Sequence, residues 1–325
     1  MSSEFNKAPF PYFGGKSTIA HKIWQYLGQP KHYIEPFFGS GAVLLLRPDY
    51  NPTVHIETVN DKDGFIANVW RALKDNPNEV AKWCDWPVNH VDLHARRNKL
   101  IANEDRLLQN LMNDDTWYDA KLAGYWIWAA SCWIGGGLTK GANQDSICGR
   151  PDIAKAGRGI HRISLCGRPD IAHRGKGVHT MTVRNNGIYD WFNQLSNRLR
   201  YVRVVCGDWK RVCGGNWQDI IGTVGIFFDP PYSSPDRSTV YHHDSYDIGK
   251  EVEDWCLKRG DKKTYRIVTA GYEGEYQKLI EANWTVEEWK AQGGYSNQGE
   301  TQNDNRFKER LFISPHCITN QYKMF

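Results

Sequence analysis

The sequence predicts an α/β fold with a parallel, doubly wound sheet, and three observations lead to it. A short apolar strand, "HYIE", runs into a glycine turn and the start of a helix. The next segment, "PTVHIETVND", alternates like a strand, ends in an acid and precedes the helical "GFIANVWRALKD". Similar strand and helix signals return after residue 200. Strands that alternate with helices in this way pair in parallel.

The other elements follow in chain order. Residues 17–27 have a helical apolar face, which consists of Ile19, Ile23, Trp24 and Leu27. Residues 76–132 are helical in pattern, whereas 135–183 are rich in glycine and basic residues and have no sustained period. Beyond them we expect a helix at 188–200, a strand at 201–209 and a strand ending at Asp229. The last predicted elements are a strand at 264–271, a helix at 272–282, a strand at 284–291 and a strand at 309–315. The sheet domain is therefore predicted at 1–75 and 200–325, with a mainly helical and loop-rich insert at 76–199.

The composition is that of an ordinary globular chain. Of 325 residues, 40% are hydrophobic and 24% are charged, and the formal net charge is +4. No apolar run approaches the roughly 20 residues of a membrane span, and the N-terminus lacks an apolar signal core, so we expect a cytoplasmic protein. Eight cysteines without a C-x-x-C pair argue against a structural zinc site and fit reduced thiols.

The insert contains a tandem duplication with a strong positive charge. "CGRPDIAKAGRGIH" at 148–161 recurs as "CGRPDIAHRGKGVH" at 166–179, and ten of the fourteen positions are identical. Residues 140–184 contain nine Lys or Arg residues and only three Asp residues. Such a segment suits a polyanion, which it would bind by counterion release, although a solvated basic loop without a partner is the alternative. The candidate contacts, chosen on charge alone and expected at phosphates rather than bases, are Lys140, Arg158, Arg162, Arg174 and Lys176.

Two glycine turns resemble nucleotide motifs but fail their spacing. In "EPFFGSG" the third glycine of a dinucleotide fingerprint would fall on Leu44, and in "GGKST" the first glycine of a P-loop would fall on Phe10. A glycine turn between strand and helix still lets the backbone approach a ligand. Asp61 and Asp208, each at a strand end, could bind such a ligand or cap a helix.

The stretch "GIFFDPPYSS" is the most specific signal. An apolar strand ends in Asp229, and Pro230 and Pro231 then fix the backbone and remove two amide donors. The Asp229 carboxylate and the Pro230 carbonyl together make an acceptor pair for an amino group, and Tyr232 offers a flat face for a planar ring. A rigid turn without a ligand is the alternative for four residues taken alone.

Taken together, these motifs resemble the Dam-like DNA adenine methyltransferases. In that family a GGK-containing motif precedes F-x-G-x-G, here Phe37, Gly39 and Gly41, and a target-recognition insert separates them from D-P-P-Y. "VVCGDW" and "RLFISPHC" resemble the strand before the catalytic one and the last core strand. The resemblance covers roughly 5–75 and 200–315, and the duplicated arm is a departure from it.

The resemblance implies a Rossmann-like methyltransferase sheet and a site-specific transfer, as in restriction-modification enzymes, from S-adenosylmethionine to the N6 amine of a flipped-out adenine in duplex DNA. It also implies a monomer without a metal, acting in the cytoplasm of a bacterium or of a phage's host. The catalytic residues would be Asp229, Pro230, Pro231 and Tyr232. The cofactor-binding residues would be Tyr12, Gly14, Lys16, Glu35, Pro36, Phe37, Gly39, Ser40, Gly41, Asp61, Asp208 and Asp229.

Three alternatives stay open at the level of sequence. D-P-P-Y also serves methylation of the cytosine N4 amine. RNA or protein-glutamine amine methylation is a different substrate class, against which the GGK motif and the basic insert count. A binding module with an inactive site is disfavoured by the intact Asp229–Tyr232 motif.

Overall fold

A computed structural model describes residues 8–10, 12, 15–133, 138–139, 187–231, 248–289 and 309–318. The chain divides into two compact units. The sheet unit consists of Met1–Asn6, Lys16–Asp61 and Tyr201–Phe325, and the helical unit of Lys7–Gly15 and Lys62–Arg200. The predicted boundary at 75/76 lies one helix beyond this division, and the roles of the two parts remain predictions.

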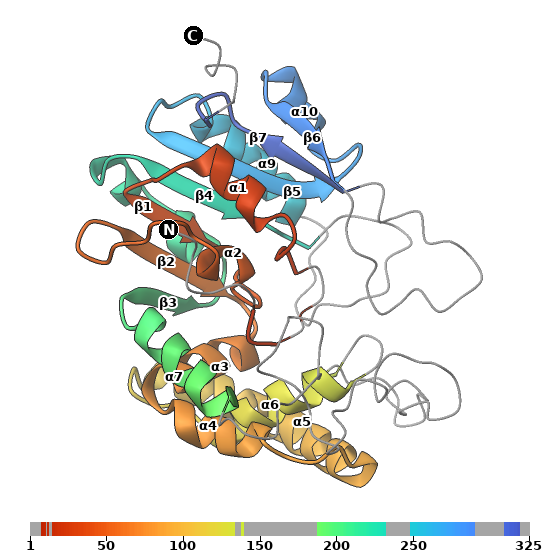
Figure 1. Ribbon diagram of the computed structural model, residues 1–325. Coiled ribbons are helices and arrows are strands. Elements are labelled where there is room, and N and C mark those ends of the chain that lie inside the picture. Colours follow the sequence, from red (N-terminus) through yellow and green to blue (C-terminus); the bar gives the residue numbers. More distant parts are fainter. Residues whose placement is uncertain are drawn as a thin grey trace. The chain divides into compact units, whose positions relative to one another are not determined.

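The sheet unit is built on a seven-stranded sheet in the order β3-β2-β1-β4-β5-β7-β6 (Figure 1). The pairs β1–β2, β1–β4, β2–β3 and β4–β5 are parallel, so the first five strands have the doubly wound order that alternating strands and helices predict. The strands are β1 His32–Glu35, β2 Ile56–Asp61, β3 Val202–Cys206, β4 Val224–Phe228, β5 Tyr265–Tyr272, β6 Thr285–Glu288 and β7 Glu309–Ile313.

One strand departs from the predicted parallel arrangement. β7 pairs antiparallel with both β5 and β6, so β6 runs in the same direction as the five parallel strands. Apolar alternation predicts that a segment is a strand but not its direction, because the side-chain period is the same in parallel and antiparallel ladders. The predicted α/β class is confirmed, and the sheet is that of a Rossmann-like methyltransferase fold.

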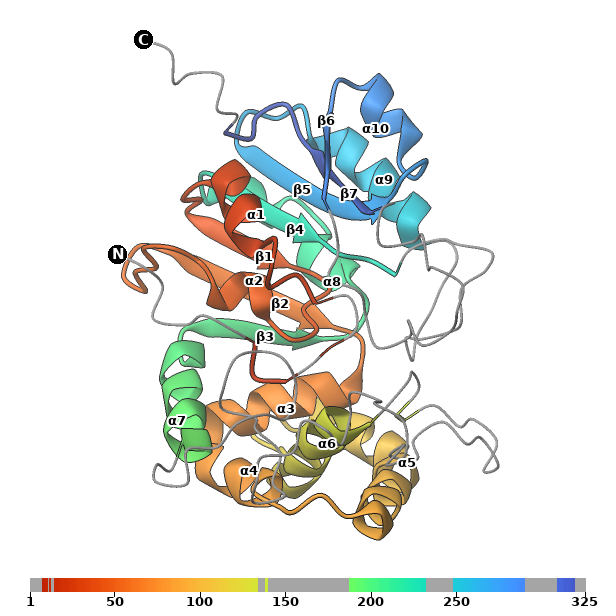
Figure 2. The same ribbon diagram turned by 45° about the vertical axis from the view of Figure 1, so that its right-hand side comes forward.

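Helices cover both faces of the sheet, as the two views show (Figures 1 and 2). On β4, Val224, Ile226 and Phe228 join the apolar cluster under α8, α9 and α10. On the other face the α1 ring of Trp24 lies 4.6 Å from that of Tyr33 in β1. The helices on these faces are α1 Ala20–Leu27, α2 Ala42–Leu45, α8 Lys210–Cys213, α9 Ile248–Arg259 and α10 Gln277–Glu281, and the 3-10 turn η2 is Trp217–Ile220.

The predicted helix at 272–282 is wrong in its first half. Gly274 has a φ of 87° and Tyr276 a φ of 57°, and neither value is compatible with a right-handed helix. Helix α10 therefore begins only at Gln277. The sequence prediction also missed α9, whose buried Ile248, Val252 and Cys256 are spaced four residues apart.

Helices make up the helical unit where they were predicted. They are α3 Gly64–Asp75, α4 Pro77–Cys84, α5 His90–Asn113, α6 Ala120–Cys132 and α7 Gly187–Leu199. Polar N-caps begin four of them, because Asp63, Asn76, Asn89 and Asp119 accept hydrogen bonds from first-turn amides. No helix in these described ranges is long and apolar enough to cross a bilayer.

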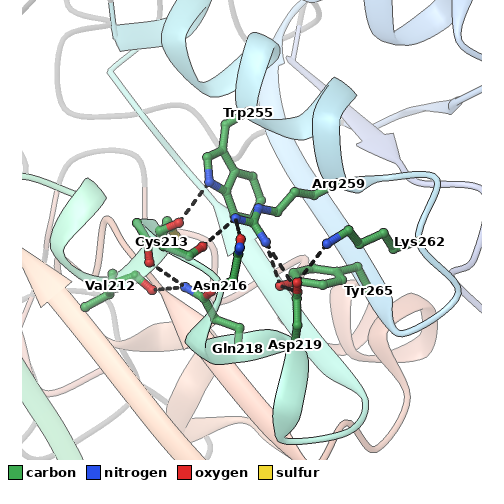
Figure 3. A network of polar contacts seen from close by, with 11 residues as sticks. Val212, Cys213, Asn216, Gln218, Asp219, Trp255, Arg259, Lys262 and Tyr265 are labelled. Atoms are coloured by element: carbon green, nitrogen blue, oxygen red, sulfur yellow. Dashed lines mark hydrogen bonds and ion pairs between the residues drawn. The ribbon is translucent and has the colours of Figure 1, made fainter.

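A polar network fixes the chain between β3 and β4 to the amino end of β5 (Figure 3). Asp219 accepts hydrogen bonds from Tyr265 Oη at 2.5 Å, Lys262 Nζ at 2.8 Å and Arg259 Nη1 at 3.3 Å. Trp255 Nε1 donates to the Cys213 carbonyl at 2.9 Å. Because Tyr265 is the first residue of β5, this network lies at the edge of the sheet opposite to the carboxyl ends of the parallel strands.

Candidate active site at the carboxyl ends of the parallel strands

The acidic residues singled out in the sequence follow neighbouring parallel strands. Asp61 ends β2, Asp208 follows β3, and Asp229 follows β4. In a parallel sheet these carboxyl ends share one edge. Strands β1 and β4 are hydrogen-bonded neighbours although the chain connects β1 to β2 on the other side, so the order reverses between them. Open α/β sheets bind ligands at such a reversal.

The glycine turn after β1 has the conformation that its sequence requires. Gly39 and Gly41 have φ values of 49° and 66°, which side chains with a Cβ rarely adopt. The Gly41 N–H donates to the Phe38 carbonyl at 2.9 Å, and the Phe38 N–H donates to the Asn60 carbonyl at 2.9 Å. Ser40 is buried within the turn. The turn is therefore compact and is tied to the end of β2.

Asp61 orients this turn. Its Oδ2 accepts a hydrogen bond from the Gly39 N–H at 2.8 Å. The alternative role weighed for it, a helix cap, is wrong, because Asp63 accepts the first-turn amide of α3. Asp61 thus joins β2 to the candidate ligand-binding turn through its side chain.

Asn60 is a site residue that sequence reasoning missed. Its side chain is 1% exposed, and Nδ2 donates to the Pro36 carbonyl at 3.0 Å and to the Gly207 carbonyl at 3.0 Å. One amide thereby links the turn after β1 to the turn after β3. The signal that could have found it was a buried polar residue at the end of an otherwise apolar strand, since such a group is retained only where it finds partners.

The turn after β3 carries Asp208 and Trp209. Asp208 is exposed, and its Oδ1 accepts the Lys210 N–H at 2.9 Å, but the N-cap residue of α8 is Trp209. The Trp209 ring is 3% exposed and lies 6.4 Å from Phe37 and 5.8 Å from Phe228. Aromatic rings from three strand ends therefore meet beneath this edge.

Asp229 lies against Lys16. The Lys16 Nζ is 2.9 Å from Asp229 Oδ1, and the two side chains are 3% and 20% exposed. Pro230 is buried directly after Asp229. The structure thus brings the N-terminal GGK lysine and the D-P-P-Y aspartate into direct contact.

Glu35 is buried at the end of β1. Burial raises the pKa of its carboxyl well above the ordinary value, and the negative charge of Asp229 acts in the same direction. Hydrogen bonds from the Tyr33 hydroxyl, at 2.9 Å, and from the Leu44 backbone oppose this pKa shift. Glu35 supports the turn from within the protein.

The strand-end residues fit a polar cofactor. The turn at Gly39–Gly41 carries no side chain larger than that of Ser40, and Asp61 and Asp208 carry carboxylates at adjacent strand ends. Two buried polar atoms, Asn60 Oδ1 and Trp209 Nε1, have no hydrogen-bond partner among the described residues. An orphaned buried donor and acceptor beside a glycine turn are consistent with a ligand that has both kinds of group.

The remaining predicted site residues belong to the helical unit or lie outside the described part of the chain. Tyr12 belongs to the helical unit, where its ring lies 6.4 Å from Trp126. Seven predicted residues lie outside the described part of the chain, as does the duplicated segment: Gly14, Tyr232, Lys140, Arg158, Arg162, Arg174 and Lys176. Their roles remain predictions.

The fold and the strand-end site are consistent with a Rossmann-like methyltransferase, and the comparisons show which known family part of the chain resembles. The model of the D12 class N6 adenine-specific DNA methyltransferases matches residues 12–119. A "DNA N-6-adenine-methyltransferase" of Escherichia phage P1 is 32% identical over 73 residues, which is 22% of this chain and 9% of that protein. The chain therefore spans about a tenth of the length of this curated relative. The predicted resemblance to the Dam-like family is confirmed by a match that covers the N-terminal third.

Proposed function

We propose that the protein transfers a methyl group from S-adenosylmethionine to the N6 amine of adenine in duplex DNA. The observation that carries this proposal is the position of Asp229 at the end of β4, next to the β1 turn, where the strand order reverses. The family match over 12–119 supports it, because that segment contains the glycine turn and Asp61.

Asp229 and Pro230 hold the target amine. The amine nitrogen is a weak nucleophile, since its lone pair is delocalised into the ring. The Asp229 carboxylate and the Pro230 carbonyl accept the two N–H groups and favour a tetrahedral nitrogen whose lone pair is localised. The negative charge of Asp229 also stabilises the positive charge that develops on the nitrogen.

Bound S-adenosylmethionine would supply the electrophile, a sulfonium methyl whose bond to sulfur breaks as the amine lone pair bonds to the carbon. S-Adenosylhomocysteine would be the leaving group, and the methylated nitrogen would become neutral by losing a proton to water. Lys16 and the turn at Phe37–Gly41 bind the methionine part of the cofactor, Asp61 lies toward the ribose, and Asp208 lies toward the adenine. Most of the rate enhancement then comes from holding two reactants in line.

The substrate base leaves the duplex. An adenine within stacked base pairs cannot reach a carboxylate at a strand end, so it flips out, and Tyr232 stacks on its ring. The basic arm at 140–184 and the helical unit contact the DNA, chiefly at phosphates.

Nucleoside analysis tests this function. The protein is incubated with methyl-labelled S-adenosylmethionine and genomic DNA from a methylation-deficient bacterium, and the DNA is digested to nucleosides. We expect label in N6-methyldeoxyadenosine. Label in N4-methyldeoxycytidine selects the cytosine alternative, and label only in RNA or protein included in parallel reactions refutes DNA methylation.

Asp229→Ala is the matched variant for this assay. We expect it to abolish transfer while the protein still binds S-adenosylhomocysteine, because the residue acts on the amine. If transfer and cofactor binding are lost together, Asp229 has only a structural role.

A further inference from the structure

Lys16 is buried among acceptors. Its Nζ lies 2.9 Å from Asp229 Oδ1, 3.9 Å from Glu309 Oε2 and 5.7 Å from the centre of the Trp289 ring. Its side chain is 3% exposed, so this ammonium relies on protein groups rather than water. All four residues belong to the sheet unit.

This contact conflicts with the roles that the proposed function gives the two residues. Asp229 must accept hydrogen bonds from the target amine, yet Lys16 occupies one of its oxygens. A lysine that stayed on Asp229 would also place a positive charge beside the nitrogen that becomes cationic, which raises the barrier to transfer. A short move of Lys16 away from Asp229 removes both obstacles.

We propose that Lys16 exchanges carboxylates, leaving Asp229 for the carboxylate of the cofactor's amino-acid part when the cofactor binds. This inference rests on the proposed function. The exchange keeps the buried ammonium paired throughout, and the Asp229 carboxylate that it leaves is the more exposed of the two groups, at 20% against 3%. Glu309 and the Trp289 face lie near enough to hold the ammonium while its partner changes.

The exchange couples the two substrate sites. Asp229 competes with the cofactor carboxylate for Lys16, so the free protein binds the cofactor less tightly than it would without that aspartate. Once the cofactor holds Lys16, Asp229 can accept the amine, and by reciprocity the flipped base favours cofactor binding. A residue at the amine site therefore weakens binding of the cofactor in the absence of DNA.

Calorimetric titration of four proteins with two probes tests this competition. The proteins are the wild type, Asp229→Asn, Lys16→Met and the double variant. S-Adenosylhomocysteine carries the carboxylate, and 5′-methylthioadenosine lacks the whole amino-acid part. We expect Asp229→Asn to bind S-adenosylhomocysteine about tenfold more tightly than the wild type, and no such gain for 5′-methylthioadenosine. In the Lys16→Met background the gain disappears.

Asp261→Asn is the matched control, because it removes an exposed carboxylate of the sheet unit to which the proposed function gives no role. If Asp261→Asn tightens binding as much, the effect is that of net charge and the exchange is refuted. Unchanged or weaker binding by Asp229→Asn also overturns it, as does a gain that persists in the Lys16→Met background. Wild-type protein that binds neither probe would instead contradict the proposed function itself.

Discussion

Asn60→Ala is expected to lower both the free energy of unfolding and the affinity for the cofactor. The loss of affinity should exceed that caused by an equally destabilising substitution elsewhere in the protein. The wild-type side chain is 1% exposed and donates one hydrogen bond to the Pro36 carbonyl and one to the Gly207 carbonyl, both at 3.0 Å. Alanine leaves two carbonyls without this donor, and an unsatisfied buried group costs about 1–3 kcal/mol. The loss of Asn60 Oδ1, which has no partner among the described residues, offsets about 1 kcal/mol. The free energy of unfolding should fall by about 1–5 kcal/mol.

Binding of S-adenosylhomocysteine should weaken at least about tenfold, or about 1.4 kcal/mol, because the turns after β1 and β3 lose their common link. Urea denaturation measures the stability, and calorimetric titration measures the affinity under conditions in which the variant is folded. Transitions are followed by two probes, since a chain with two compact units need not unfold in one step.

Asn68→Ala provides the control. Asn68 is also 1% exposed and makes two hydrogen bonds to the Asp119 backbone, at 2.9 Å and 2.8 Å, but it lies in the helical unit. We expect Asn68→Ala to lose a similar amount of stability. Its affinity for S-adenosylhomocysteine should stay within about twofold of the wild type, which is a much smaller change than the tenfold loss, about 1.4 kcal/mol, expected for Asn60→Ala. Equal losses of affinity in the two variants, or an unchanged affinity in Asn60→Ala, would refute the proposed linking role.

Three further outcomes follow from the structure. Burial, with the charges of Arg203 and Arg47, lowers the pKa of His32 to about 4, so the free energy of unfolding should fall by about 3 kcal/mol as the pH drops from 6.5 toward 4. Urea denaturation at several pH values measures this dependence. If His32→Gln shows the same dependence on pH, another group causes it. Asp219→Asn should lower the free energy of unfolding by about 1 kcal/mol, because its network is partly exposed. Methyl transfer should persist, because the network lies at the sheet edge opposite to the candidate active site. Loss of transfer in a folded variant would contradict this. Deleting 148–179 should weaken DNA binding. The slope of log K against log salt should become less steep by about 0.9 for each phosphate that the shortened protein no longer neutralises. An identical slope would exclude the duplicated segment from the DNA interface.

Local sequence patterns predicted which segments are strands and where they end. Apolar alternation before Asp61 and an apolar run before Asp229 each mark a strand that stops at an acid, and both strands exist. The glycine turn after the first strand was predicted from the same kind of local signal, because glycine readily adopts the positive φ values that Gly39 and Gly41 have. Local preference alone could not give the direction of β7, which depends on pairing with strands distant in sequence.

Contacts between distant segments account for what was missed at the site. From the sequence, Lys16 could pair with a ligand carboxylate or be an exposed lysine at a helix start, and nothing near it indicates Asp229 as its partner. The packing of α1 against β4 and β5, which are far from it along the chain, brings the N-terminal motif to the end of β4. The contact matters because it makes the two substrate roles interdependent: a residue predicted for the cofactor and a residue predicted for the base share one buried charge. On the proposed exchange, neither motif can be understood from its own residues, and variants of either one change the binding of both substrates.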